Sequence, residues 1–215
     1  PGARGEGCGA GGGARVTRTT VHLVRHGEVY NPKKVLYGRM PGYHLSSRGR
    51  SMAAVTSQFF EGRDVTYLAA SPLERAQETA EPIAEVTGCE VHTRTDIIEA
   101  GNTFEGLRTK GWRSQLLNPI RWRHMTNPLE PSWGESYEAI RARMCDAVDS
   151  ARAEAEGHEA VLVSHQLPIV MVQRYVQGKR LAHASRECDL ASVTSLVFDG
   201  DVVVDWSYDT PAERI

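Results

Sequence analysis

Two arginines and two histidines are of residue types that could act together on an anion. Arg25 and His26 are adjacent in the chain, whereas Arg75 and His165 lie far from them and from each other. The planar guanidinium fork suits phosphate and carboxylate groups, and imidazole exchanges protons near neutral pH. These side chains are therefore candidates for one anion-handling site, provided that the fold brings them together.

The elements that would position these residues are predicted strands. Short apolar runs, rich in β-branched and aliphatic residues, stand at 19–24, 64–70 and 160–163, which is typical of buried strands. Each run is followed directly by one part of the candidate set. Because ligands bind beyond the carboxyl ends of strands in parallel α/β sheets, we expect the four side chains to share one pocket.

Helical patterns alternate with these strands, and the chain ends in a predicted hairpin. The predicted helices lie at 45–60, from Ser71 onward, at 135–155 and from Pro168 onward, and the hairpin strands lie at 192–198 and 202–206. The alternation predicts a three-layer α/β/α fold with a mostly parallel central sheet. An irregular or helical insertion would cover the site, and the hairpin would complete the sheet.

The segment that begins at Ser71 carries a helix-start pattern. Ser71 is the predicted N-cap, Pro72 stands at the first helical position, and Glu74 completes a capping box. This pattern puts Arg75 in the first turn, where the helix dipole disfavours a cation by about 0.3–1 kcal/mol. A bound anion at that helix end would offset the penalty.

Length and composition predict one folded domain. Residues 1–15 are rich in glycine and hold no large apolar side chain, so we expect a disordered tail. Residues 16–215 form the predicted single domain, with the insertion at about 102–133. This insertion contains Trp, Arg, Asn and Pro without a clear helical or strand period.

Charge and cysteine usage exclude several functional classes. The net charge of −2 argues against a nucleic-acid binder, which would be basic. The four cysteines show neither CxxC spacing nor histidine pairs at zinc intervals, so we expect no metal site and no disulfide framework. No apolar run reaches membrane-spanning length, and no signal-peptide pattern is present. We therefore expect a cytoplasmic protein without a membrane partner, and a homo-oligomer is possible.

Several segments together resemble the histidine phosphatase superfamily, also called the phosphoglycerate mutase-like family. The matching segments, in the order of that family, are LVRHGE at 23–28, SPLERAQETA at 71–80, FEG at 104–106, GES at 134–136 and VSH at 163–165. Each motif alone is a weak signal, and RHG is a chance-level tripeptide. Their ordered occurrence is a specific one.

The resemblance implies a role for each matched side chain. His26 would be the nucleophile that takes the phosphoryl group as phosphohistidine, and Glu99 would give a proton to the leaving oxygen. The phosphate oxygens would be held by Arg25, Arg75, Asn31 and His165. Cationic hydrogen bonds of this kind supply most of the catalysis in phosphoryl transfer, so neither a metal nor a cofactor is implied.

Three assignments have alternatives. Asn31 comes one position earlier than in the family pattern, and an asparagine before Pro32 is also a typical turn residue. Glu105 competes with Glu99 for the role of proton donor, and the motif order favours Glu99. Finally, the cluster of Arg121, Arg123 and His124 in the insertion could contact a remote anionic part of a substrate, or it could be a solvated surface loop.

The function predicted from these residues is hydrolysis of a small phosphomonoester by a metal-independent phosphatase. A phosphomutase of the phosphoglycerate mutase type would use the same intermediate and return the group to the product. Mutases of this type carry an arginine-rich segment with a double proline in the insertion. Here the insertion carries only isolated prolines, which disfavours this alternative. A non-catalytic protein that binds a phosphorylated ligand is a further alternative, although neither the histidines nor the arginines of the pattern are lost.

Overall fold

The computed structural model describes residues 18–102, 105–107, 134–182 and 187–215. The tail predicted at 1–15 and nearly all of the insertion predicted at about 102–133 lie outside the described residues. Within the described residues, strands and helices alternate along the chain as the sequence predicts, and they build the layers that position the candidate site.

The centre of the fold is a six-stranded sheet in the order β3-β2-β4-β1-β5-β6. The strands are β1 (Arg18–Arg25), β2 (Val65–Ala70), β3 (Val91–Thr93), β4 (Glu159–Ser164), β5 (Val193–Asp199) and β6 (Val202–Asp209). The first four in sequence order pair in parallel, and β5 and β6 add an antiparallel edge. The mostly parallel sheet and the terminal hairpin are thus confirmed, whereas the short strand β3 was not predicted.

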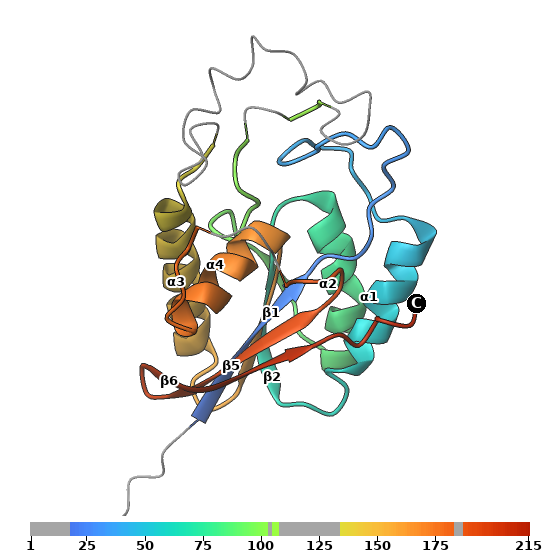
Figure 1. Cartoon of the computed structure of the whole chain (residues 1–215). Helices are drawn as coiled ribbons and strands as arrows, with labels where there is room; N and C mark the ends of the chain where they lie inside the picture. Colours follow the sequence, from blue (N-terminus) through green and yellow to red (C-terminus); the bar gives the residue numbers. More distant parts are fainter. Residues whose placement is uncertain (1–17, 103–104, 108–133, 183–186) are drawn as a thin grey trace, which may run out of the picture.

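Helices cover both faces of this sheet (Figure 1). One face is covered by α1 (Ser47–Gln58) and α2 (Glu74–Thr87), and the other by α3 (Tyr137–Glu154) and α4 (Gln166–Val176). Each face has its own apolar core, because alternate residues of a strand point to opposite sides of the sheet. In β1, for example, Leu23 belongs to the α3 and α4 side and Val24 to the α2 side. The three-layer α/β/α architecture is confirmed.

The predicted N-cap at Ser71 is wrong. Helix α2 begins at Glu74, with Leu73 at the N-cap position and no side-chain cap bond. The backbone N–H of Ser71 instead donates to the Val163 carbonyl at 3.0 Å and so continues the pairing of β2 with β4. Its hydroxyl lies 2.7 Å from Nε2 of His165. A buried imidazole that needs a partner therefore takes the group that would otherwise cap the helix.

The carboxyl ends of β1, β2 and β4 meet at one edge of the sheet. In the ladder between β1 and β4, Arg25 is paired with Ser164, and the loops that follow the parallel strands gather at the upper end in Figure 1. His26, Ser71 and His165 each follow the last residue of one of these strands. The sheet alone thus brings together residues that are far apart in sequence.

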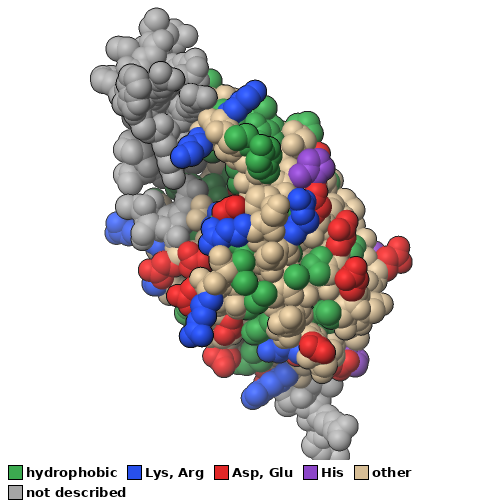
Figure 2. All heavy atoms as spheres, turned by 90° about the vertical axis from the view of Figure 1, so that its right-hand side faces the viewer, with side chains coloured by type: hydrophobic (Ala, Val, Ile, Leu, Met, Phe, Trp, Pro, Cys, Tyr) green, Lys and Arg blue, Asp and Glu red, His purple; other side chains and the backbone are tan. Residues whose placement is uncertain are grey.

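Charges are mixed on the molecular face shown in Figure 2, which is the right-hand side of Figure 1. Acidic and basic side chains are interspersed there rather than gathered into a field of one sign.

None of the helices in the described ranges is both long enough and apolar enough to cross a membrane.

The loop after β1 packs directly against the backbone of α1. A Cβ atom on Gly27 would lie 2.5 Å from the carbonyl oxygen of Gly49, and one on Gly49 would lie 2.0 Å from the carbonyl oxygen of Glu28. Real Cβ atoms do not approach so closely, so both positions require glycine. The contact fixes the chain directly after His26.

Replacing Gly49 with alanine should therefore destabilise the protein, although alanine normally favours a helix by about 1 kcal/mol over glycine. The added methyl group overlaps the Glu28 carbonyl, and such overpacking costs about 1–3 kcal/mol. Urea titration measures the change. Ser51→Ala, at an exposed position of α1, is the control and should stay within about 0.5 kcal/mol. Unchanged stability of Gly49→Ala would contradict the close approach.

Candidate active site

His26 is buried directly after β1, with one ring nitrogen already used. Nδ1 lies 2.8 Å from the carbonyl oxygen of Gly27, and only 2% of the residue is exposed. A carbonyl only accepts hydrogen bonds, so Nδ1 carries the ring proton. Nε2 consequently keeps its lone pair, as a nucleophile requires.

His165 lies beside His26, at the N-cap position of α4. The two ring centroids are 5.2 Å apart, with an angle of 60° between the ring planes. Nε2 of His165 is 2.7 Å from the hydroxyl oxygen of Ser71, which also accepts a long bond of 3.5 Å from the N–H of Leu73. When the hydroxyl donates to Nε2, Nδ1 of His165 carries the proton and becomes a hydrogen-bond donor.

Both histidines are held neutral in the ligand-free site. Burial lowers the pKa of His26 well below its usual value, and the nearby charges of Arg75 and Arg25 lower it further. Burial also lowers the pKa of His165, with additional contributions from His26 and Arg75. Like charges and loss of water both disfavour imidazolium. Both imidazole rings are therefore uncharged.

Arg75 is fully buried, with 0% of the residue exposed. Its Nη2 donates to the carbonyl of Gly38 at 2.6 Å, and its guanidinium carbon lies 4.8 Å from the ring centroid of Tyr37. Gly38 has a φ of +39°, and a Cβ there would lie 2.2 Å from Oε1 of Glu105. A glycine carbonyl and an aromatic face thus orient the guanidinium group.

Several buried donors of these residues have no hydrogen-bond partner. In the described part of the chain, six buried side-chain polar atoms lack a partner, and four belong to this site. These are Nε of Arg25, Nε and Nη1 of Arg75 and Nδ1 of His165. An unpaired buried donor destabilises a fold by about 1–3 kcal/mol, so their concentration beside His26 indicates a place for an acceptor-rich anion.

A cavity of about 480 Å³ opens onto Arg25, His26 and Glu99. It is larger than a phosphate group requires, and Lys34 and Leu167 also line it. Arg75 and His165 are fully buried and do not line this cavity. Within the described ranges, no group of three or more His, Cys, Asp or Glu residues has the arrangement of a metal site.

The two candidate proton donors differ in their surroundings. Glu99 lines the cavity, and its Oε1 accepts a bond of 2.8 Å from the N–H of Ala100. Oε1 of Glu105 instead accepts bonds from the N–H groups of Arg39, at 2.9 Å, and Asn102, at 3.3 Å. The geometry therefore favours Glu99 for chemistry, and Glu105 ties two loops together.

Comparison with known proteins identifies the family of the chain. The family model described as histidine phosphatase superfamily (branch 1) matches residues 21–208. The chain belongs to the histidine phosphatase superfamily. An uncharacterized protein of Mycobacterium tuberculosis, Rv0525, is 51% identical over 196 residues, which cover 90% of this chain and 97% of that protein.

More distant members of the superfamily carry descriptive names. A probable phosphoglycerate mutase, GpmB, of Photorhabdus laumondii is 28% identical over 79% of this chain and 80% of its own length. The solved structure of a mycobacterial glucosyl-3-phosphoglycerate phosphatase superposes with a TM-score of 0.70 and 22% identity, over 90% of this chain and 98% of that one. At this identity, the second match shows a shared fold.

The structure shows which hydrogen bonds the Asn31 side chain makes, which the sequence motif left open. Its amide nitrogen donates to the Val35 carbonyl at 2.8 Å, and its amide oxygen accepts from the Val35 N–H at 3.2 Å. The side chain thus shapes a turn, although the residue also lines the cavity. Contact of Asn31 with phosphate stays a prediction. The cluster of Arg121, Arg123 and His124 lies outside the described residues.

Sequence reasoning missed the partners that orient the motif residues. Tyr37 and Gly38 fix Arg75, Ser71 binds His165, and the Cys188 carbonyl accepts from Nη1 of Arg25. Two of these partners are backbone carbonyls, which leave no residue-type signal in a sequence. Ser71 does belong to one of the matched motifs, but its local pattern predicted a helix cap rather than a partner for His165.

Replacing Arg75 with methionine should raise the melting temperature of the ligand-free protein. The change removes a buried cation with unpaired donors and leaves an apolar chain in its place. Inorganic phosphate should stabilise the unaltered protein, by about 2.7 kcal/mol at a hundredfold excess over Kd, but should not stabilise Arg75→Met. Thermal melts with and without phosphate measure both effects.

Arg63→Met is the matched control for this experiment, because Arg63 lies over the Phe59 ring, outside the site. Stabilisation by phosphate should persist in this variant. Equal stabilisation of Arg75→Met and the unaltered protein would show that Arg75 does not hold the anion.

The two neutral histidines should make the ligand-free protein sensitive to acid. Below about pH 6.5 the unfolded chain binds protons that the folded chain does not, because both folded-state pKa values are lowered. Each group then lowers the free energy of unfolding by about 1.4 kcal/mol per pH unit. This stability is fully present above pH 6.5 and is lost as the pH falls.

Urea titrations between pH 5 and 8 in phosphate-free buffer, for the unaltered protein and His26→Gln, isolate one of the two groups. The difference in stability between the two proteins should be constant above pH 6.5. It should shrink below pH 6.5, because only in the unaltered protein does residue 26 gain a proton on unfolding, which lowers the free energy of unfolding. Parallel curves over the whole range would show that His26 binds its proton normally when folded.

Proposed function

We propose that this protein is a metal-independent phosphatase that hydrolyses a small phosphomonoester through a phosphohistidine intermediate. One observation carries the proposal. The free lone pair of His26 lies beside a concentration of buried donors, in Arg25, Arg75 and His165, that have no partner among the described residues. A nucleophile surrounded by unpaired donors suits attack on a group that bears three acceptor oxygens.

In the first step, Nε2 of His26 forms a bond to phosphorus while the bond from phosphorus to the substrate oxygen breaks. The carboxylic acid of Glu99 gives its proton to that oxygen, which leaves as an alcohol. The dianionic phosphate favours the protonated form of a nearby carboxyl group. The guanidinium groups and Nδ1–H of His165 stabilise the spread charge of the transferring group.

In the second step, water attacks the phosphohistidine. The Glu99 carboxylate takes a proton from this water, the phosphorus–nitrogen bond breaks, and the electron pair returns to Nε2 of His26. Inorganic phosphate is released, and the site regains its starting protonation. Side chains of the protein supply the acid, the base and the cationic donors of this cycle, and water replaces the proton that the alcohol takes away, so EDTA should leave the activity unchanged.

A mutase is the second candidate, because relatives of this chain are named probable phosphoglycerate mutases. It would form the same intermediate but return the phosphoryl group to a hydroxyl of the product. We further propose that Arg121, Arg123 and His124 contact the remote part of the substrate. Both reactions predict a phosphorylated His26, and they differ in what accepts the group.

Replacing His26 with alanine should abolish hydrolysis of p-nitrophenyl phosphate and leave the melting profile cooperative. Loss of both the nucleophile and its intermediate removes the covalent route. Acid-labile phosphate on the protein, trapped by rapid quench with a labelled substrate, should be present before the change and absent after it. His92→Ala, at an exposed position of β3, should keep both properties.

A second assay decides between the phosphatase and the mutase reaction. In this assay, a panel of phosphorylated metabolites is measured for free phosphate and for isomerised product. Release of phosphate without isomer supports the phosphatase, whereas isomer without phosphate supports the mutase. Retention of activity by His26→Ala would overturn the nucleophile assignment for both.

A further inference from the structure

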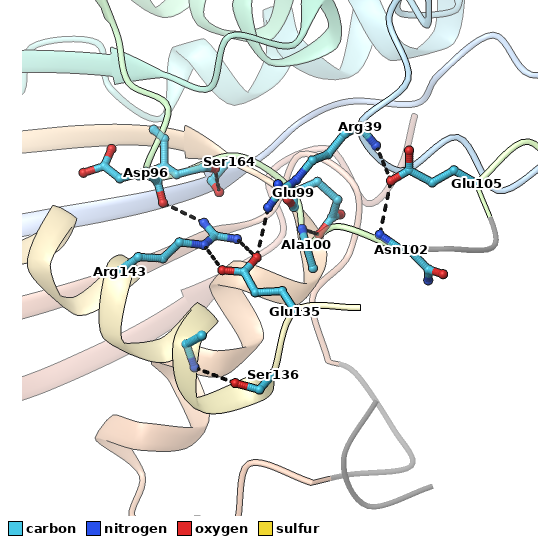
Figure 3. Close-up of polar contacts among 12 residues, drawn as sticks. Arg39, Asp96, Glu99, Ala100, Asn102, Glu105, Glu135, Ser136, Arg143 and Ser164 are labelled. Atoms are coloured by element: carbon cyan, nitrogen blue, oxygen red, sulfur yellow. Dashed lines mark hydrogen bonds and ion pairs between the residues drawn. The ribbon is translucent and has the colours of Figure 1, made fainter. Parts of the chain in front are cut away.

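Three charged side chains outside the cavity form a bridge that neither the motif roles nor the proposed chemistry uses. The carboxylate of Glu135 lies between two guanidinium groups (Figure 3). Its Oε2 accepts from Nη2 of Arg39 at 2.9 Å, and its Oε1 accepts from Nε of Arg143 at 2.7 Å. Nη2 of Arg143 adds a bond of 3.1 Å to Oε2. We call this set the Arg39–Glu135–Arg143 bridge.

Both arginines of the bridge also hold the main chain of the segment that carries Glu99. Nε of Arg39 donates to the carbonyl of Glu99 at 2.6 Å, and Nη1 of Arg143 donates to the carbonyl of Asp96 at 2.6 Å. From the sheet side, the Ser164 hydroxyl donates to the Ile97 carbonyl at 2.7 Å. The segment is thus held from α3, from the end of β4 and from the loop that follows β1.

The bond from Arg39 acts on the peptide group that sets the direction of the acid. The carbonyl of Glu99 and the N–H of Ala100 belong to one planar peptide unit. Its oxygen binds Arg39, while its N–H donates to Oε1 of Glu99 at 2.8 Å. Because the unit is rigid, fixing its oxygen also fixes the N–H that holds the carboxyl group.

The Glu135–Arg143 half of the bridge is mostly buried, whereas Arg39 is exposed. The side chains of Arg143 and Glu135 are 18% and 22% exposed, and that of Arg39 is 39% exposed. Exposed ion pairs contribute little, but here one carboxylate receives three hydrogen bonds from two forks. Paired guanidinium–carboxylate bonds of this kind fix geometry as well as charge.

We propose that Glu135, through the Arg39–Glu135–Arg143 bridge, is a positioning residue that holds the Glu99 carboxyl group in place for proton transfer. The inference rests on the proposed function, in which Glu99 protonates the leaving oxygen. Proton transfer requires the acid within hydrogen-bond reach of that oxygen, and a displacement of about 1 Å lowers a rate by as much as 10²-fold. Loss of the bridge therefore weakens acid catalysis without removing the acid.

The test compares two leaving groups, because only an alkoxide needs a proton to leave. Glu135→Gln should lower kcat/KM about 10-fold with β-glycerol phosphate and less than about 3-fold with p-nitrophenyl phosphate. Glu99→Gln should show the same selectivity with a larger loss, of about 10²-fold on the alkyl substrate. The ratio of the two kcat/KM values is a readout that a purely structural role would not move.

Glu138→Gln is the matched control. Glu138 lies in the first turn of α3 and pairs with Arg141, and its side chain is 66% exposed. The substitution is the same, on the same helix end, and should leave both kcat/KM values unchanged. Thermal melts of all variants show whether each one folds.

A double variant tests whether Glu135 acts through Glu99. In a Glu99→Gln background, Glu135→Gln should cause no further loss on β-glycerol phosphate, because there is no acid left to position. Arg39→Lys supplies a second route if Glu135→Gln fails to fold. It keeps the charge at an exposed site, loses the fork that reaches both Glu135 and the Glu99 carbonyl, and should show the same selectivity.

The outcomes separate failure of this inference from failure of the proposed function. Equal losses on both substrates, or the same loss with and without Glu99, would show that the bridge only stabilises the fold. If Glu99→Gln lowers kcat/KM selectively but the bridge variants do not, the acid is correct and the positioning role is wrong. If Glu99→Gln has no effect, or if neither probe is hydrolysed by the unaltered protein, the proposed function itself is contradicted.

Discussion

The burial of Arg75 with two unpaired donors is the constraint on which the site depends. A guanidinium group in an apolar interior is unfavourable unless its N–H groups are paired, and only Nη2 finds a carbonyl, that of Gly38. The fold tolerates this because two apolar cores, one on each face of the sheet, supply the stability around it. The unpaired donors lower the stability of the fold, and they are already in place for the anion that we propose the site binds.

His26 and His165 are the same residue type, but their hydrogen-bond partners differ. The Gly27 carbonyl fixes the proton of His26 on Nδ1 and leaves a lone pair on Nε2. Ser71 occupies Nε2 of His165, and Nδ1 has no hydrogen-bond partner among the described residues. Burial and the neighbouring arginines keep both rings neutral. The partner of each ring thus determines which of its nitrogens carries the proton.

The outer part of the site is organised by charges that do not reach the cavity. The Glu105 carboxylate accepts hydrogen bonds from the backbone N–H groups of Arg39 and Asn102. The Glu135 carboxylate forms ion pairs with the side chains of Arg39 and Arg143. Arg39 thus joins two carboxylates to the carbonyl of Glu99, and its neighbour Gly38 holds Arg75. Arg75 and the segment that carries Glu99 are therefore tied to the same short loop, at Gly38 and Arg39.

The sequence by itself determined the family and the layered fold, because hydrophobic period and motif order can be recognised in the chain before it folds. Only the tertiary structure decided what each candidate side chain faces. Ser71 matches a helix cap in sequence, yet it belongs to the sheet edge, where a buried imidazole takes its hydroxyl. Motif order already favoured Glu99 over Glu105, and the structure adds that Glu99 lines the cavity whereas Glu105 ties two loops together. Such choices depend on hydrogen bonds between residues distant in sequence, many of them to backbone carbonyls, which no residue pattern records.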